Sequence, residues 1–159
     1  MSFSSVLKLI VSILVCQLAG FVGSLLTTPS IPTWYEGLSK PSFNPPNWIF
    51  SPVWITLYVL MGISLFLVWQ KGVGSPQGRM ALVVFFCQLA LNILWSLFFF
   101  HLHLPFLAFV EILVLWLAIL VTIMSFYRIS KLAAVLLFPY ILWVSFAAIL
   151  NFSLWRLNL

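Results

Sequence analysis

Charged side chains are almost absent from this sequence. Of its 159 residues only 6% are charged, aspartate does not occur, and 64% are hydrophobic. Soluble domains carry about 25% charged residues, and so few polar side chains cannot cover the surface of a soluble globule of this length. The composition therefore excludes a soluble protein and predicts an integral membrane protein in contact with the lipid bilayer.

Groups that carry conventional enzyme chemistry are also scarce. The two carboxylates, two histidines and two cysteines form no metal-ligand cluster, no Ser-His-Asp set and no pair of acids. Residues 71–79 form a turn without the GxxxxGK spacing of a phosphate loop. Hydrolysis, phosphoryl transfer and hydride transfer are unsupported, and we expect no metal site and no required cofactor.

The remaining scarce groups are equally informative. The seven basic residues are scattered singly between apolar runs, so no stripe could follow a phosphate backbone and nucleic acid is not an expected partner. Cys16 and Cys87 both lie in apolar runs, which predicts two free, buried thiols rather than a disulfide.

Long apolar runs dominate what is present. Each is about the length of the ~20 residues that cross a ~30 Å hydrocarbon core. The first run could also be a cleavable signal peptide, but it is longer than the usual apolar region of one. The sequence predicts an all-α membrane protein, a bundle of five transmembrane helices in a single domain 1–159, with helices at residues 9–26, 48–69, 80–100, 105–126 and 132–155.

Basic residues favour one side of the membrane. With five spans, Lys8, Lys71, Arg79, Arg128 and Lys131 fall on the side of the N-terminus, and only Lys40 and Arg156 fall on the other. Cytoplasmic ends of membrane helices carry the excess of lysine and arginine. The N-terminus is therefore predicted to be cytoplasmic and the C-terminus to lie outside.

Tryptophan is the most informative residue type, with eight copies. Trp34, Trp48, Trp69 and Trp155 fall at predicted helix ends, where anchoring at the membrane interface explains them. The other four lie at least one turn inside their helices, where an indole packs the bundle or lines a cavity. Trp116 has only apolar neighbours in the sequence and is assigned to packing or lipid, which leaves Trp54, Trp95 and Trp143.

Polar and small residues accompany these three indoles at helical spacing. Tyr58 is one turn from Trp54, while Asn92 and Gln88 precede Trp95 and must face the bundle interior, because amides exposed to lipid are costly. Ala147 follows Trp143 by one turn. A flat, apolar ligand with polar edges suits aromatic faces and amides brought together in this way.

Prolines shape the predicted pocket. Pro139 should bend the last helix and open space beside it, whereas Pro52, early in its helix, should cause at most a mild kink. Pro41, Pro45 and Pro46 should stiffen residues 40–47 into a loop that acts as a lid.

Three ionisable groups leave alternatives open. His101 and His103 could supply an axial ligand to a haem, although two imidazoles in a surface loop are more often simply solvated. Glu111 is the one carboxylate inside a predicted span and a candidate functional residue, but it could also reach the interface or cap a neighbouring helix.

Residues 34–62 also carry a family resemblance. Their patterns WYxxLxKPxFxPPxW and FxPVWxxLYxxMG, with QLAxNxxW at 88–95 and PYxxWxxFAxxLN at 139–151, resemble the translocator protein family, also called tryptophan-rich sensory protein (TspO) or peripheral-type benzodiazepine receptor. The resemblance implies a five-helix bundle, usually a homodimer, whose members bind porphyrins and, in animals, cholesterol and synthetic drugs. It places the chain in a bacterial cell membrane or an outer mitochondrial membrane.

The resemblance also implies roles for particular residues. Some bacterial relatives are thought to degrade porphyrin in light, and Trp54 and Trp143 occupy the implicated positions as tentative catalytic residues. Helix three would supply much of the dimer contact, with Ala81 and Ala90 as local candidates. The candidate ligand-binding residues are Gly23, Leu26, Tyr35, Trp54, Tyr58, Gln88, Asn92, Trp95, Trp143, Ala147 and Leu150.

These observations predict a membrane receptor or sensor for tetrapyrroles such as protoporphyrin IX, which it could also transport or degrade. Two alternatives stay open: a cholesterol or lipid translocator, and a structural scaffold without a small-molecule site. Animal relatives carry a Leu/Val, Tyr, Lys/Arg sterol pattern on helix five, but here Phe152 stands in place of the tyrosine between Leu150 and Arg156. Because the pattern is broken, the sequence favours tetrapyrrole binding over cholesterol binding.

Overall fold

The computed structural model describes residues 3–159, which are almost entirely helical. Five stretches within this range are long and apolar enough to cross a membrane, as the sequence predicted. The last stretch consists of two helices, and a π-helical turn follows the third. The α-helices are α1 (Phe3–Thr27), α2 (Asn47–Lys71), α3 (Pro76–Ser96), α4 (Pro105–Tyr127), the short α5 (Lys131–Leu136) and α6 (Phe138–Leu157). The 3₁₀ turns are η1 (Thr28–Ser30) and η2 (Tyr35–Gly37), and the π-helical turn is η3 (Leu97–His101).

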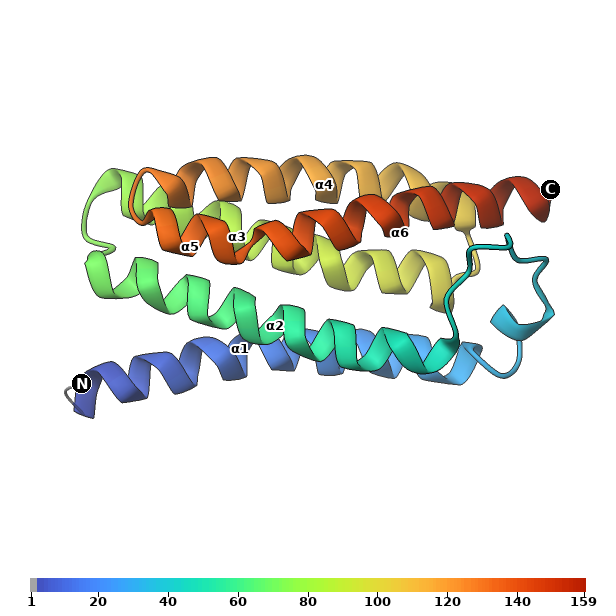
Figure 1. The fold of residues 1–159 in the computed structure, drawn as a ribbon, viewed down its shortest axis with the longest axis horizontal. Helices are drawn as coiled ribbons and strands as arrows, with labels where there is room; N and C mark the ends of the chain where they lie inside the picture. Colours follow the sequence, from blue (N-terminus) through green and yellow to red (C-terminus); the bar gives the residue numbers. More distant parts are fainter. Residues whose placement is uncertain (1–2) are drawn as a thin grey trace.

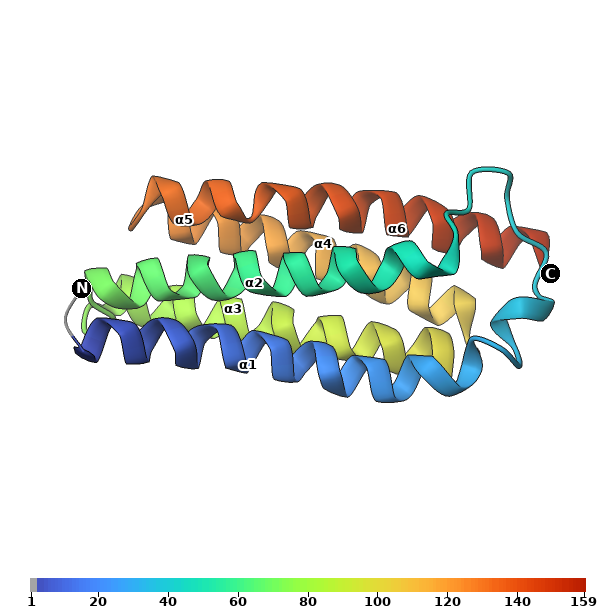
Figure 2. The same cartoon turned by 60° about the horizontal axis from the view of Figure 1, so that its bottom comes forward.

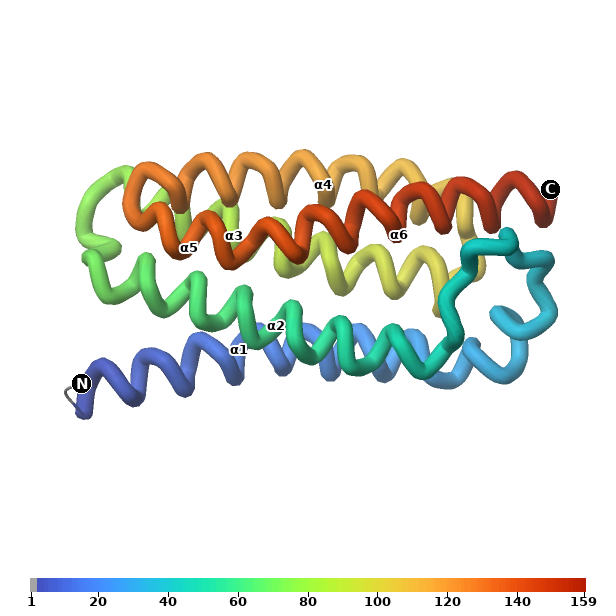
Figure 3. The backbone as a smooth tube through the Cα atoms, viewed as in Figure 1, coloured from blue at the N-terminus to red at the C-terminus, as the bar shows by residue number. Residues whose placement is uncertain are grey.

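The helices run side by side along one axis, and successive spans alternate in direction (Figures 1 and 2). The turns between α2 and α3 and between α4 and α5 lie at the end where α1 begins. The long α1–α2 connection, the α3–α4 connection and the C-terminus lie at the other end, which we call the loop end (Figure 3). The outer faces carry many exposed apolar side chains, such as Leu18, Leu142 and Ile149, as expected for a protein surrounded by lipid.

Helix α3 begins earlier than the sequence analysis predicted. The predicted turn at 71–79 shortens because Ser75 caps the helix, its Oγ accepting a hydrogen bond from the Gly78 amide at 3.0 Å. Pro76 occupies the first helical position, where its missing N–H is not needed. The Ser-Pro pair that starts the helix is visible in the sequence, but the glycines around it led to the prediction of a turn.

The two helix prolines behave as predicted. Helix α2 continues through Pro52, whereas the last span breaks at Leu137, two residues before Pro139. Proline at position 139 cannot donate to the carbonyl four residues back, so Leu137 adopts a turn and its amide bonds to Ala134 and Val135 carbonyls instead.

Helices α1 and α2 approach closely at two glycines. A Cβ atom on Gly62 would lie 2.6 Å from Cα of Ile13, and one on Gly20 would lie 2.5 Å from Cε2 of Tyr58. Small residues allow the backbones of membrane helices to come into contact. In lipid the hydrophobic effect does not drive helices together, so van der Waals packing at such contacts stabilises their association. These contacts position the α1 wall of the cavity described below.

The basic residues divide between the two ends of the bundle as the sequence predicted. Lys71 ends α2 and Lys131 begins α5 at the end where α1 starts, whereas Lys40 lies in the connection at the loop end (Figure 1). We therefore expect the start of α1 on the cytoplasmic side and the loop end outside. Reporter domains fused to the two termini should report opposite sides of the membrane, and the same side for both would contradict this arrangement.

Two predictions about small surface residues need correction. Ala81 is fully buried within the chain, so it cannot contact a second copy, whereas Ala90 faces outward. Cys16 is a buried free thiol, but Cys87 is exposed on α3. Ala81 lies seven residues before Gln88, on the face of α3 that the buried amides mark, whereas Cys87 and Ala90 lie on exposed faces. Apolar surroundings alone, on which both predictions rested, do not separate these faces.

Candidate functional site

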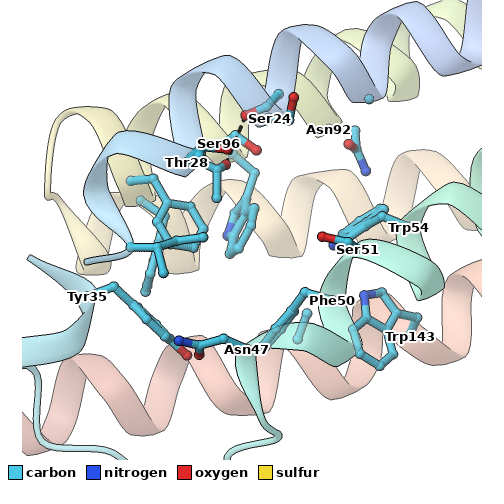
Figure 4. Close-up of a pocket in the computed structure, with 18 of the residues that line it drawn as sticks. Ser24, Thr28, Tyr35, Asn47, Phe50, Ser51, Trp54, Asn92, Ser96 and Trp143 are labelled. Carbon is cyan, nitrogen blue, oxygen red and sulfur yellow. Dashed lines mark hydrogen bonds between the residues drawn. The ribbon is translucent and has the colours of Figure 1, made fainter. Parts of the chain in front are cut away.

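A cavity of about 410 Å³ lies in the half of the bundle next to the loop end. Its walls come from α1, α2, α3, η3 and α6, together with Ile31 and Tyr35 of the α1–α2 connection. Figure 4 shows Tyr35, Asn47 and Phe50 along one side of the cavity and Ser24, Thr28 and Ser96 along the opposite side. This volume is in the range of cavities that hold small organic ligands.

The structure brings most of the candidate ligand-binding residues together around this cavity. Nine of the eleven line it: Gly23, Tyr35, Trp54, Tyr58, Asn92, Trp95, Trp143, Ala147 and Leu150. Leu26 and Gln88 do not line it. Leu26 is half-buried on α1, and Gln88 is fully buried on α3, one turn before Asn92.

Sequence reasoning missed several lining residues. On α1 they include Gln17, Gly20 and Ser24, and Thr28 follows at the start of η1. On α2 they include Phe50 and Ser51, one turn before Trp54. Extending the helical faces of Gly23 and Trp54 by one to two turns would have found them. The exposed Phe21 and Ile55 also line the cavity, so it reaches the bundle surface between α1 and α2.

Aromatic rings form much of the cavity surface. Trp54 stacks on Tyr58 with ring centroids 5.6 Å apart, and Trp143 meets Phe50 edge to face at 6.0 Å. On α3, Trp95 stacks on Phe99 at 5.3 Å. Trp54 and Trp143 come from neighbouring helices and lie on the same side of the cavity (Figure 4). No hydrogen bond from either indole N–H occurs within residues 3–159.

A chain of hydrogen bonds begins at the deepest end of the cavity. The Tyr58 hydroxyl donates to Asn92 Oδ1 at 2.5 Å, and Asn92 Nδ2 donates to the Tyr140 hydroxyl at 2.9 Å. Tyr140 in turn donates to Gln88 Oε1 at 2.9 Å. All four side chains are buried, which confirms that the amides of α3 face the bundle interior.

A second polar contact supports the opposite wall. Trp95 Nε1 donates to Asn151 Oδ1 at 3.0 Å, and Asn151 Nδ2 donates to the Pro105 carbonyl at 2.8 Å. That carbonyl lies in the first turn of α4, and the bond links α4 to α6. The Trp95 ring is thereby fixed in orientation, and its N–H is already used.

The α1–α2 connection is held in place over the loop end. The Tyr35 hydroxyl donates to Asn44 Oδ1 at 2.8 Å, and the Asn158 side chain accepts from the Ser39 amide and donates to its carbonyl. Burial raises the pKa of Tyr35, and the bond to Asn44 partly offsets this rise. Residues 40–46 do not line the cavity themselves; Asn44 acts by fixing Tyr35, which does.

The ionisable candidates lie outside the cavity. No charged side chain of residues 3–159 lines it. His101 and His103 are both exposed, as the solvated interpretation predicts. His103 also stacks on Trp34 with centroids 4.4 Å apart and contacts Ser30 Oγ at 3.3 Å, and neither histidine lines the cavity.

Glu111 neither reaches the interface nor caps a helix. Its side chain is buried, and neither carboxylate oxygen has a hydrogen-bond partner within residues 3–159. Trp116 packs against the hydrophobic core, as assigned, and its Nε1 also donates to Ser145 Oγ at 2.8 Å. Trp116 lies on α4 and Ser145 on α6, so the contact could not be predicted from the residues next to Trp116 in the sequence.

Comparisons with known proteins cover nearly the whole chain. Residues 12–156 match the TspO/MBR family. The chain is 46% identical over 154 residues to the tryptophan-rich protein TspO of Archaeoglobus fulgidus, covering 97% of this chain and 99% of that protein. It is 40% identical to the translocator protein of Homo sapiens, covering 89% and 85%, and 37% identical to the tryptophan-rich sensory protein of Cereibacter sphaeroides, covering 90% and 86%. The chain therefore belongs to the TspO/MBR family of multi-pass integral membrane proteins.

Proposed function

We propose that this protein binds a tetrapyrrole such as protoporphyrin IX in the cavity. The observation that carries the proposal is the lining of the cavity, to which residues 3–159 contribute three indoles, two phenols and several phenyl rings but no charged side chain. Aromatic faces favour a planar conjugated ligand through offset stacking and edge contacts, and each such contact contributes about 0.5 to 1.5 kcal/mol beyond area burial.

The two ends of the cavity suit the two kinds of edge of such a ligand. The deep end is enclosed by α2, α3 and α6, where apolar substituents of the ring would be buried. At the loop end Lys40 lies over the face of Tyr35, with Nζ 4.9 Å from the ring centroid. A carboxylate on the ligand would be stabilised at that end and destabilised at the other, because charges separated from water need a partner.

We further propose that bound tetrapyrrole is degraded in light, with dioxygen as the oxidant. Trp54 or Trp143 would donate one electron to the excited ring. The reduced ring then adds both oxygen atoms of dioxygen across one carbon–carbon bond of a methine bridge, and cleavage of that bond opens the macrocycle. The electron returns to the indole radical, so ring opening consumes one dioxygen and no external reductant. The position of both indoles in the cavity lining supports this electron-transfer role. The role is independent of their contribution to ligand binding.

A homodimer is the third part of the proposal. The outer face of α3, with Ala90 exposed on it, is the surface that the family resemblance favours. Close helix approach in lipid needs small residues, and Ala90 is the remaining local candidate now that Ala81 is known to be buried.

The proposed binding is tested by titrating purified protein in mild detergent with protoporphyrin IX and following tryptophan fluorescence. We expect saturable quenching with one ligand per chain, unaffected by excess cholesterol. Displacement by cholesterol would favour a sterol translocator instead, and quenching that never saturates would favour a scaffold without a ligand site.

A further inference from the structure

The cavity is open on one side of the bundle. The lining residues that come from α3, η3 and α6 are all buried or half-buried. The exposed residues of the lining are Phe21, Ser24 and Thr28 on α1 and η1, and Asn47, Ser51 and Ile55 on α2. A residue that lines a cavity and is also exposed lies at an opening of that cavity. The cavity therefore opens between α1 and α2, and we call this opening the lateral slot.

The two edges of the lateral slot face each other at matching heights. Helices α1 and α2 run in opposite directions and come into contact where Gly62 meets Ile13 (Figure 1). Counting the same number of residues from this contact toward the loop end places Ser24 of α1 level with Ser51 of α2. No hydrogen bond within residues 3–159 joins Ser24 to Ser51, so no polar contact closes the middle of the slot.

The lateral slot becomes more polar toward the loop end. Its lower end is apolar, with Phe21 and Ile55 59% and 57% exposed, and Gln17 Nε2 crosses to the Ile55 carbonyl at 3.0 Å. Its upper end carries Thr28 and Asn47. At about 1.5 Å per residue, Phe21 and Ile55 lie roughly 9 to 12 Å from the loop-end termini of their helices, within the ~15 Å of hydrocarbon in one leaflet. The slot thus follows the change from hydrocarbon to headgroups.

The loop end of the cavity is covered instead. Tyr35 is only 4% exposed and packs against Phe99 and Phe100. The Ser30 hydroxyl donates to the Phe100 carbonyl at 2.5 Å, which bonds the α1–α2 connection to η3. A ligand that entered along the bundle axis would have to displace these contacts, whereas a ligand that entered between α1 and α2 would leave them in place.

We propose that ligands enter and leave the cavity sideways through the lateral slot, directly from the bilayer leaflet at the loop end. The inference rests on the proposed function in using the same cavity, and it deepens that function by naming the ligand class: amphiphiles dissolved in lipid, with an apolar body and a polar end. The apolar body passes at the level of Phe21 and Ile55, while the polar end stays level with Thr28 and Asn47. Permanently charged solutes are excluded, because no charged side chain of residues 3–159 lines the route.

Reactivity of a cysteine inside the cavity tests this route without a porphyrin. Ala147 lines the cavity on α6, so Ala147→Cys is introduced into a chain whose own thiols are removed by Cys16→Ala and Cys87→Ala. The protein in lipid nanodiscs is treated with N-phenylmaleimide, which is neutral and dissolves in lipid, or with a trimethylammonium thiosulfonate, which stays in water. Each rate is divided by the rate of the same reagent with glutathione, and the maleimide value should exceed the thiosulfonate value at least about tenfold.

Filling the lateral slot gives the decisive comparison. Ser24→Phe and Ser51→Phe together place two rings level with each other in the slot, and maleimide labelling should slow at least about tenfold, the effect of about 1.4 kcal/mol on a barrier. Leu25→Phe is the matched control, because Leu25 is exposed on α1 beside Ser24 but does not line the cavity. Its labelling rate should equal that of the unfilled protein. Each single serine variant should slow labelling in part, which keeps the test available if the double variant does not fold.

Equal relative rates for the two reagents, or maleimide labelling that neither the double nor the single serine variants slow, would overturn the proposal and favour entry through the loop end. Absence of labelling by both reagents in the unfilled protein would overturn it as well, because the slot would then be closed. The association rate of protoporphyrin IX is scored separately. If the filled variants block maleimide labelling but leave porphyrin association unchanged, the proposed function is contradicted and the lateral route stands.

Discussion

Light-driven loss of bound protoporphyrin IX is expected to slow at least roughly tenfold in Trp54→Phe and in Trp143→Phe, which corresponds to about 1.4 kcal/mol in the activation free energy. Phenylalanine can still contact the face of the ring, so binding should weaken by no more than about 0.5 to 1.5 kcal/mol. A phenyl ring is much harder to oxidise than an indole, so the electron step should suffer more than the binding step. Both indoles line the cavity, and both N–H groups are free to face a ligand.

The measurement separates these two effects. The dissociation constant comes from fluorescence quenching in the dark, and the bleaching rate comes from the porphyrin absorbance under constant light at saturating protein. Trp116→Phe is the matched control, since Trp116 bonds to Ser145 away from the cavity. If all three variants bleach and bind alike, Trp54 and Trp143 are packing residues only.

Replacing Gly62 by leucine is expected to destabilise the bundle by about 3 kcal/mol or more, the upper range for overpacking a close contact. The first added carbon already lies 2.6 Å from Cα and 3.0 Å from N of Ile13. These are backbone atoms, so α1 as a whole must move away from α2. Because α1 supplies one wall of the cavity, porphyrin binding should be lost together with stability.

The thermal unfolding midpoint in detergent, followed by circular dichroism, gives the stability, and Gly23→Ala is the control. A Cβ on Gly23 would lie 3.4 Å from Ser96 Oγ, an ordinary contact, and alanine gains up to about 1 kcal/mol in helix propensity over glycine. Gly23→Ala should therefore be neutral or slightly stabilised. An unfolding midpoint of Gly62→Leu equal to that of wild type would show that α1 and α2 are not in fixed backbone contact.

The sequence alone was sufficient to predict the class of protein and the positions of its membrane-spanning helices. Apolar length fixes how many helices cross a membrane, because every backbone polar group in lipid must be satisfied within its helix. Intramembrane amides such as Asn92 were predictable as inward-facing for the same reason. A distortion at Pro139 was predictable because proline lacks an N–H, although the prediction was a bend and the structure has a break at Leu137. Helix ends were less certain, as the early start of α3 at Pro76 shows.

Only the tertiary structure decided which inward-facing residues share a cavity and which lie behind it. Gln88 and Asn92 are one turn apart, and both are surrounded by apolar residues in the sequence, yet Asn92 lines the cavity and Gln88 does not. In a membrane helix both the lipid face and the core face are apolar, so hydrophobic periodicity, which marks the inner face of a soluble helix, carries little information here. Packing between helices, at contacts such as Gly62 with Ile13 and Trp95 with Asn151, determines the rotation of each helix and therefore the site.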